Sequence, residues 1–291
     1  MFFQRIKSEG IAHNSYMVAS GSEAFVVDPR RDCQVYVDLA RQEGVRIRYI
    51  FETHGNEDYV VGSLELQQST GAEIFHGPGL EWKYGNMLSE RQEFIIGRLK
   101  LTAIGTPGHT HESMSYVLTD ISTGNEAVIV FTGDALFVGD VGRTDFYGVD
   151  NVPKVASSLY DSIFNKILPL GDGVILCPAH GSGSVCGINI ASRDESTLGI
   201  EKRQNPVLRL TRKEDFVKFK MAEKPEVPYY FRQMEKYNLE GPPLLGCMPL
   251  PAPLTPKEFK LAMEKGAVVY RYQPPGRFRW SAYQGGLQHL A

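Results

Sequence analysis

Four segments of this chain share one arrangement, in which an apolar, strand-like run leads to a polar residue beside a glycine. Runs of β-branched and aromatic residues predict strands, and the residues just past a strand end lie at the edge of the sheet. The neighbouring glycines permit close packing of the backbone at that edge. We therefore expect the four polar side chains to meet there and form a functional site; they are His54, His109, Asp134 and His180.

Two imidazoles and one carboxylate, from His54, His109 and Asp134, are the ligand types of non-haem Fe(II) oxygenases. Such a triad occupies one face of the ion and leaves the other positions open. Open positions can hold a sulfur substrate and dioxygen side by side. A catalytic zinc ion with bound water uses the same ligand types, so the residues alone leave iron and zinc as alternatives.

Residues 53–59, which read Thr-His-Gly-Asn-Glu-Asp-Tyr, resemble the metal-binding loop Thr-His-x-His-x-Asp-His of the metallo-β-lactamase superfamily. The later ligands of that family lie in similar Gly-His, Gly-Asp and Ala-His-Gly contexts. Asn56 and Tyr59 stand where the family has its second and third histidines. In two-metal hydrolases such as glyoxalase II those histidines supply one ligand to each metal. The two replacements therefore argue against a dinuclear hydrolytic site.

The retained positions match the persulfide dioxygenase branch of the superfamily, and the resemblance covers roughly residues 1–240. Residues 138–146 (Val-Gly-Asp-Val-Gly-Arg-Thr-Asp-Phe) and 241–243 (Gly-Pro-Pro) are similar to that branch as well. The resemblance implies an α/β fold, a four-layer αββα sandwich, with one Fe(II) per chain held by His54, His109 and Asp134. It also implies oxidation of a low-molecular-weight persulfide, such as glutathione persulfide, by O2 to sulfite and thiol.

Two other functions remain open at this point. The first is a mononuclear zinc hydrolase of glutathione-type thioesters, in which Asp58 assists a metal-bound hydroxide. The second is a non-catalytic, sulfur-related binding protein that has kept a remnant metal site, as the replacements at Asn56 and Tyr59 suggest.

Five further residues are expected near the metal or the substrate. Asp58 can orient a metal-bound histidine, and His180 is expected in a similar supporting or substrate-contacting position. Tyr59 either donates a hydrogen bond to a metal-bound water or simply packs. Asn56 can bind a metal only weakly through its amide oxygen. Arg143 lies in a loop near the site and either meets the substrate or anchors the loop.

Hydrophobic periodicity predicts the other elements of this region. Strands are expected at residues 2–7, 15–19, 24–27, 48–52, 73–75, 113–118, 127–132 and 173–177, a hairpin over 93–102 that turns at Gly97-Arg98, and helices at 34–43, 62–68 and 152–166. A helical cap is expected from about residue 197, with helices at 212–223 and 229–238. Lys202 and Arg203 in the cap can pair with substrate carboxylates, although a solvated charge pair is an equal alternative.

The composition predicts a catalytic domain over residues 1–240, a proline-rich linker over 241–256 and a tail over 257–291. The tail, with an expected helix at 256–265 and strand at 267–272, resembles the start of a rhodanese domain. It is too short for that whole fold, and no cysteine follows Cys247 to act as a rhodanese nucleophile. Phe278, Trp280 and Tyr283 predict burial against the main domain or a partner subunit.

The remaining features predict the surroundings of the protein. A net charge of -3 without a basic cluster gives no electrostatic footprint for nucleic acid. The apolar runs are too short to cross a membrane, and residues 1–7 do not read as a signal peptide. We therefore expect a cytoplasmic protein with reduced cysteines that takes a small-molecule substrate and forms a homo-oligomer, a dimer or a tetramer.

Overall fold

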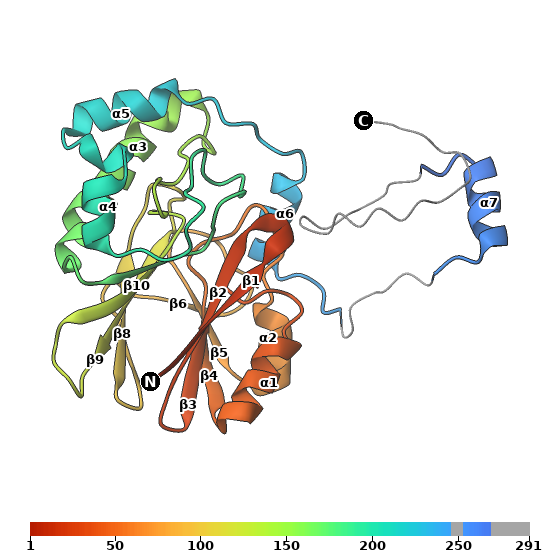
Figure 1. Cartoon of the computed structure of the whole chain (residues 1–291), viewed down its shortest axis with the longest axis horizontal. Helices are drawn as coiled ribbons and strands as arrows, with labels where there is room; N and C mark the ends of the chain where they lie inside the picture. Colours follow the sequence, from red (N-terminus) through yellow and green to blue (C-terminus); the bar gives the residue numbers. More distant parts are fainter. Residues whose placement is uncertain (246–252, 269–291) are drawn as a thin grey trace. The chain divides into compact units, whose positions relative to one another are not determined.

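The computed structural model describes residues 1–245 and 253–268. The chain divides into two compact units, Met1–Gly246 and Cys247–Ala291. In the first unit, two β-sheets pack face to face and helices cover the outer face of each sheet (Figure 1). This arrangement confirms the predicted αββα sandwich.

The first sheet has six strands in the order β1-β2-β3-β4-β5-β6. They are β1 (Phe2–Ser8), β2 (His13–Ser20), β3 (Glu23–Val27), β4 (Arg46–Phe51), β5 (Glu73–His76) and β6 (Asn86–Met87). Pairing is antiparallel from β1 to β3 and parallel from β3 to β6. The carboxyl ends of β3, β4 and β5 therefore lie at one edge, together with the first residue of β2.

The second sheet has five strands in the order β11-β10-β9-β8-β7. They are β7 (Glu93–Ile96), β8 (Leu99–Gly105), β9 (Met114–Asp120), β10 (Ala127–Gly133) and β11 (Ile175–Pro178), and the hairpin turn at Gly97-Arg98 is confirmed. β10 and β11 are parallel, whereas the other pairs are antiparallel. The ends of β10 and β11 and the β8–β9 loop therefore share one edge.

The interior between the sheets is aromatic and apolar. Its largest rings come from alternate positions of the strands, where the side chains of a strand point to one face. Neighbouring rings pack edge to face, with centroids 4.9 Å apart for Phe51 and Phe94 and 6.1 Å apart for Phe25 and Phe131. Such packing holds the strand ends, and the loops that follow them, in fixed positions.

Helices complete the outer layers. α1 (Gln34–Glu43) and α2 (Ser63–Thr70) cover the first sheet, while α3 (Val152–Asp161), α4 (Leu198–Gln204) and α5 (Lys213–Ala222) lie over the second sheet (Figure 1). α6 (Phe231–Glu240) follows in the cap. Short 3-10 turns occur at Glu9–Ile11, Val149–Asn151, Leu168–Leu170 and Val207–Arg209.

The predicted helix over 152–166 differs in its second half. The α-helix ends at Asp161, and Ser162–Ile167 continue as a π-helix. The hydroxyl of Ser162 donates a hydrogen bond of 2.7 Å to the carbonyl oxygen of Pro107. Gly108 packs so closely on the same helix that a Cβ there would lie 2.3 Å from the Cα of Leu159. The helical segment is therefore fixed to the loop that carries His109.

In the second unit, the structure describes α7 (Pro256–Glu264), which begins with a capping box between Thr255 and Glu258. Residues 267–268 form no strand, and the rest of the strand predicted at 267–272 lies outside the described residues, as do Phe278, Trp280 and Tyr283. The division into catalytic domain, linker and rhodanese-like tail stays a prediction. Among the described residues, no helix combines the length and the apolar content needed to span a bilayer.

Candidate metal centre

The four side chains expected to meet at the sheet edge are brought together there. His54 follows β4, His109 lies in the β8–β9 loop, Asp134 follows β10 and His180 follows β11. All four are at least 98% buried. Both sheets contribute, so the site spans the mouth of the sandwich.

The first group consists of His54, His109 and Asp134. Oδ2 of Asp134 lies 3.8 Å from Nε2 of His54 and 3.6 Å from Nε2 of His109. Protein ligands that share one ion with bonds of about 2.1 Å lie about 3.0 to 3.5 Å from each other. The three atoms are therefore close to the spacing of a common metal site, and neither Nε2 atom has a hydrogen-bond partner in the described part of the chain.

A hydrogen-bond relay fixes the orientation of His54. Asp28, which follows β3 with a φ of 49°, accepts bonds of 2.8 Å from the backbone nitrogen and the hydroxyl of Thr53. Burial raises the pKa of Asp28 to about 6, and this still leaves an ionised acceptor at neutral pH. The Thr53 hydroxyl thus gives its hydrogen to Asp28, and toward Nδ1 of His54, 2.8 Å away, it can only accept a hydrogen bond. Nδ1 carries the proton, and Nε2 presents a lone pair to the centre.

His109 is oriented by a similar bond. Its Nδ1 lies 3.1 Å from the carbonyl oxygen of Arg143, which can only accept. Nδ1 is therefore the donor, and Nε2 of the neutral ring points its lone pair into the centre. Burial by itself lowers the pKa of His109, but Glu57 and Asp134 outweigh that effect and raise the pKa. This position favours a positive charge, whether a proton or a metal ion supplies it.

Sequence reasoning overlooked Glu57, which lies in the same loop. Its side chain is 2% exposed, with Oε1 3.2 Å from Nε2 of His109 and Oε2 3.7 Å from Nε2 of His54. Burial opposes its ionisation, but His109 and His54 outweigh burial and lower the pKa of Glu57 to about 2. His54, Glu57 and His109 form a group whose ligand atoms all lie within 4.8 Å of one another. An acidic residue inside a metal-binding loop is the signal that could have identified it.

His180 lies between two carboxylates. Its Nδ1 is 2.8 Å from Oδ1 of Asp134, and its Nε2 is 3.0 Å from Oδ2 of Asp58. Burial lowers the pKa of His180, but Asp134 and Asp58 outweigh it and raise the pKa well above its ordinary value. His180, in turn, helps to keep the pKa of Asp134 low despite burial. His180 thus links Asp58 to Asp134, and the supporting position expected for His180 and Asp58 stays a prediction.

Asn56 and Tyr59 stand at the positions of two family histidines. The Asn56 amide donates a 3.1 Å hydrogen bond to the carbonyl oxygen of His54. The Tyr59 ring packs against His13, with centroids 4.2 Å apart, and against His180 at 6.2 Å. The phenol oxygen of Tyr59 has no hydrogen-bond partner among the described residues, so its bond to a metal-bound water stays a prediction beside the packing role. His13, to which the sequence assigned no role, is fully buried beside the site.

Arg143 anchors its loop. Its guanidinium makes two bonds of 2.8 Å to the carboxylate of Asp145, and Nη1 donates to the carbonyl oxygens of Val185 and Glu226. The side chain is 1% exposed. Of the two roles expected for Arg143, the geometry fits the anchoring of the loop whose carbonyl orients His109.

A second anchor comes from α6. Asn238, which is 1% exposed, donates bonds of 2.6 Å and 2.7 Å to the carbonyl oxygens of Asn56 and Tyr59 and accepts one of 3.0 Å from the nitrogen of Val61. The cap helix thereby holds the loop that carries His54. The sequence separation of about 180 residues hides this contact from local pattern analysis.

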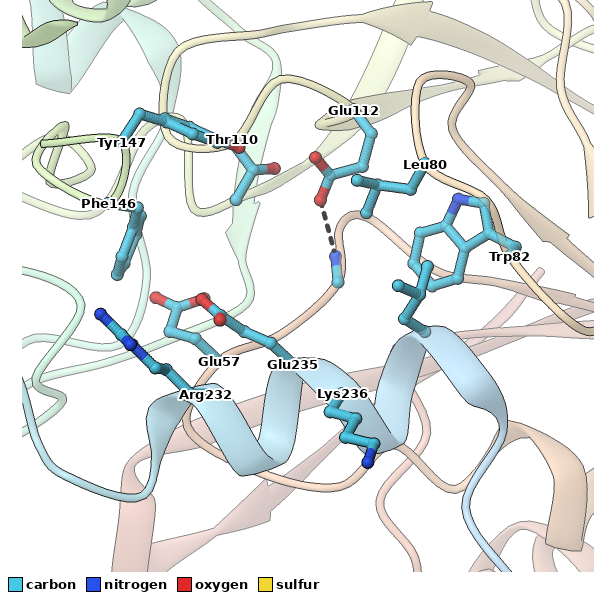
Figure 2. A pocket seen from close by; sticks show the side chains of 12 residues that line it. Glu57, Leu80, Trp82, Thr110, Glu112, Phe146, Tyr147, Arg232, Glu235 and Lys236 are labelled. Carbon is cyan, nitrogen blue, oxygen red and sulfur yellow. Dashed lines mark hydrogen bonds between the residues drawn. The ribbon is translucent and has the colours of Figure 1, made fainter.

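A cavity of about 390 Å³ opens beside the centre, between α6 and the loop that carries Trp82 (Figure 2). Glu57 belongs to its wall, which places the metal-facing loop at the base of the cavity. The wall combines apolar and charged side chains; it consists of Gly55, Glu57, Leu80, Trp82, Thr110, Glu112, Phe146, Tyr147, Arg232, Glu235, Lys236 and Leu239.

The cations at this cavity differ from those expected from the sequence. Lys202 and Arg203 do not line it, because they lie at the end of α4, where Lys202 pairs with Asp172. Arg232 and Lys236 of α6 are the lining cations instead (Figure 2). The cap therefore supplies positive charge through α6. Periodicity predicted this helix but not its contribution to the cavity.

Known proteins with similar sequences are of two kinds. Persulfide dioxygenase ETHE1 of Bos taurus is 31% identical over 207 residues, which cover 67% of this chain and 70% of that protein. Hydroxyacylglutathione hydrolase GloC of Haemophilus influenzae is 28% identical over 207 residues, which cover 64% of this chain and 87% of that protein. The similar proteins thus include both a dioxygenase and a hydrolase.

Solved structures have the same fold. A metallo-β-lactamase from Staphylococcus aureus matches with a TM-score of 0.78 and 30% identity, over 84% of this chain and 74% of its own. ETHE1 from Myxococcus xanthus matches with a TM-score of 0.71 and 25% identity, over 82% of this chain and 98% of its own. The sequence profile of the metallo-β-lactamase superfamily matches residues 9–180. The chain belongs to the metallo-β-lactamase superfamily.

Proposed function

We propose that this protein is an iron-dependent oxygenase of low-molecular-weight persulfides. The observation that carries the proposal is the pair of oriented lone pairs on His54 and His109, which face the carboxylate of Asp134 at 3.8 Å and 3.6 Å. These three residues would hold one Fe(II) per chain as a facial triad. A bound Fe(II) supplies the redox chemistry with dioxygen that oxidises the sulfur.

The residues around the centre support a single-metal site over a dinuclear one. The Asn56 amide donates to a backbone carbonyl and the Tyr59 ring packs at a tilt against His13, so neither residue supplies the imidazole that the family histidine provides. His180 and Asp58 are engaged with each other at 3.0 Å. In the reaction, a persulfide, dioxygen and water give the thiol and sulfite.

The cavity supports a thiol that carries carboxylates. Arg232 and Lys236 offer charge-assisted hydrogen bonds to such groups. Leu80, Trp82 and Leu239 provide an apolar wall that displaces water from the reacting sulfur. The chain would therefore contribute by binding, orienting and drying the substrate. Glutathione persulfide is the first substrate to test.

A zinc-dependent hydrolase of glutathione-type thioesters is the alternative, which the relationship to the Haemophilus influenzae hydrolase favours. It would use Asp58 to assist a hydroxide. That carboxylate already lies 3.0 Å from Nε2 of His180, which weakens it as a base. A binding protein with a remnant site is less favoured, because the relays that orient His54 and His109 are intact.

Metal analysis and oxygen uptake test the proposal together. Protein purified without added metal is expected to contain iron at about one ion per chain and to consume dioxygen with glutathione persulfide. Zinc together with cleavage of a glutathione thioester would establish the alternative. Size-exclusion chromatography of the same sample tests the proposed homo-oligomer, and fractionation of the source cells tests the proposed cytoplasmic location.

A further inference from the structure

We propose that Glu57 is a fourth protein ligand of the metal, beside His54, His109 and Asp134. The inference rests on the proposed single-metal centre, but it does not depend on which reaction that centre performs. It changes the ligand set from two imidazoles and one carboxylate to two imidazoles and two carboxylates.

The position of Glu57 carries the proposal. Its Oε1 is 3.2 Å from Nε2 of His109, and its Oε2 is 3.7 Å from Nε2 of His54. Oδ2 of Asp134 faces the same two nitrogens at 3.6 Å and 3.8 Å. Glu57 therefore faces the same two imidazoles as Asp134 at shorter distances, with one oxygen toward each ring where Asp134 uses a single oxygen for both.

The hydrogen bonds of the two histidines leave a site that is suited to a cation. Because both Nδ1 atoms carry the proton, both Nε2 atoms present lone pairs toward carboxylate oxygens. Nε2 of His54, Nε2 of His109 and Oε2 of Glu57 have no hydrogen-bond partner in residues 1–245 and 253–268. Lone pairs that face anions in a buried site require a positive charge between them.

In the part of the chain that the structure describes, no lysine or arginine pairs with Glu57 or Asp134. Within the described ranges, the ion-pair contacts of Glu57 are with His54 and His109, and those of Asp134 are with His54, His109 and His180. A proton shared between Glu57 and His109 is the competing arrangement in metal-free protein. A metal ion would displace that proton, as metal ions do at imidazole ligands generally.

Cys186 fixes the carboxylate of Glu57 in this direction. The thiol is fully buried and donates a hydrogen bond of 3.3 Å to Oε1 of Glu57. Carboxylates that bind metals commonly accept such orienting hydrogen bonds. Cys186 is therefore a positioning residue for Glu57.

The fourth ligand limits what the centre can accept. Glu57 also forms part of the cavity wall, so it lies on the side from which a substrate arrives. An octahedral ion with a facial triad has three open positions, whereas one that also binds Glu57 has two. A substrate that binds through two atoms would then leave no position for a second reactant, which favours a ligand that binds through one sulfur atom.

Glu57→Gln in the full chain tests the assignment without turnover. Metal-free protein is titrated anaerobically with Fe(II) against a competing chelator, and Co(II) is used as a visible-absorption probe of coordination. The parent is expected to bind one ion, and the variant to bind it more than about 100-fold more weakly with a changed Co(II) spectrum, since outer contacts alone cost about 10–100-fold. Glu235→Gln, which removes a carboxylate from the same cavity, should keep the parent affinity.

The stability of the metal-free protein separates ligation from a structural role. Because His109 and His54 lower the pKa of Glu57, metal-free Glu57→Gln should be somewhat less stable than the parent at neutral pH. Added metal should raise the unfolding temperature of the parent by more than that of the variant, which a purely structural role of Glu57 would not produce. If Glu57→Gln does not fold, Glu57→Asp serves instead, because its shorter side chain places the carboxylate farther from the metal. This variant should still bind Fe(II) more weakly and show an altered Co(II) spectrum. Unchanged affinity and an unchanged Co(II) spectrum in either variant would overturn the assignment. A lack of oxygen uptake would refute the proposed function and leave these binding results intact.

Discussion

The inter-sheet core and the metal centre are both buried, but they are stabilised differently. Phe51 and His54 are three residues apart in sequence, and so are Phe131 and Asp134. The two phenylalanines are fully enclosed by other rings of the chain. The histidine and the aspartate lie instead among other polar side chains that face one another. The core therefore contains its own packing partners, whereas in the centre the facing lone pairs and carboxylates form a site suited to a cation that the described residues do not supply.

This difference predicts how each region responds to change. Substitutions in the core should reduce stability whether or not metal is bound, because lost packing does not depend on charge. Substitutions in the centre should alter metal affinity first, because the buried carboxylates and lone pairs are compensated by the ion. The following experiments test this separation, beginning with the largest expected effect.

The largest effect is expected for His109→Ala. The variant loses an oriented nitrogen that faces both Glu57 and Asp134. Iron content after purification should fall from about one per chain to background, and persulfide-dependent oxygen uptake should disappear. The fold should remain, because the ring belongs to a loop and not to the aromatic core. A variant that retains both iron and oxygen uptake would refute this site.

Phe25→Ala is the matched change in the core. Phe25 is fully buried and packs against Phe51 and Phe131. Its truncation should lower the free energy of unfolding by about 3–5 kcal/mol, measured by urea denaturation of the metal-free protein. The metal affinity of the folded fraction should stay within about 2-fold of the parent, well below the loss of about 10–100-fold seen when outer contacts of a metal site are removed. A large loss of affinity would show that core and centre are coupled.

Thr53→Val breaks the relay from Asp28 to His54 while the shape of the side chain is kept. Without the hydroxyl, Nδ1 of His54 loses its partner and the ring its fixed orientation. Metal affinity should fall about 10–100-fold, as measured by chelator competition. Thr119→Val, a change of the same kind at a buried position of β9, is the control and should leave the affinity unaltered.

The smallest effect is expected for His180→Ala. His180 supports Asp134 through a 2.8 Å contact but is expected to stay outside the ligand set. The variant should still bind one iron at saturation, with an affinity lowered by about 10-fold. A complete loss of iron would place His180 among the ligands and contradict the supporting role.

The fold and the four strand-end residues could be predicted because their signals are local. An apolar run and the polar residue after it are adjacent in sequence, so His54 or Asp134 can be placed at a sheet edge without knowledge of the rest. The order of the layers has no local sequence signal, and it was predicted from the family resemblance. Two-fold alternation of side chains then accounts for the aromatic interior that the structure contains.

The residues that were missed depend on contacts between distant segments. Asp28 becomes important because the parallel pairing of β3 and β4 brings it to Thr53, and Asn238 because α6 returns to the loop after β4. Glu57 is a different case, since it lies inside the recognised loop. The sequence did not single it out because the family pattern Thr-His-x-His-x-Asp-His leaves its position unspecified. Arg232, on the cap helix α6, was hidden by the same lack of local signal.

The central claim is that this centre holds one iron ion that serves persulfide oxidation. Its most direct test is an oxygen-electrode trace on glutathione persulfide, recorded with protein whose metal content has been measured in the same preparation. We predict iron at about one per chain and oxygen uptake that is proportional to iron content. Zinc in place of iron, with no oxygen uptake after Fe(II) loading, would contradict the claim.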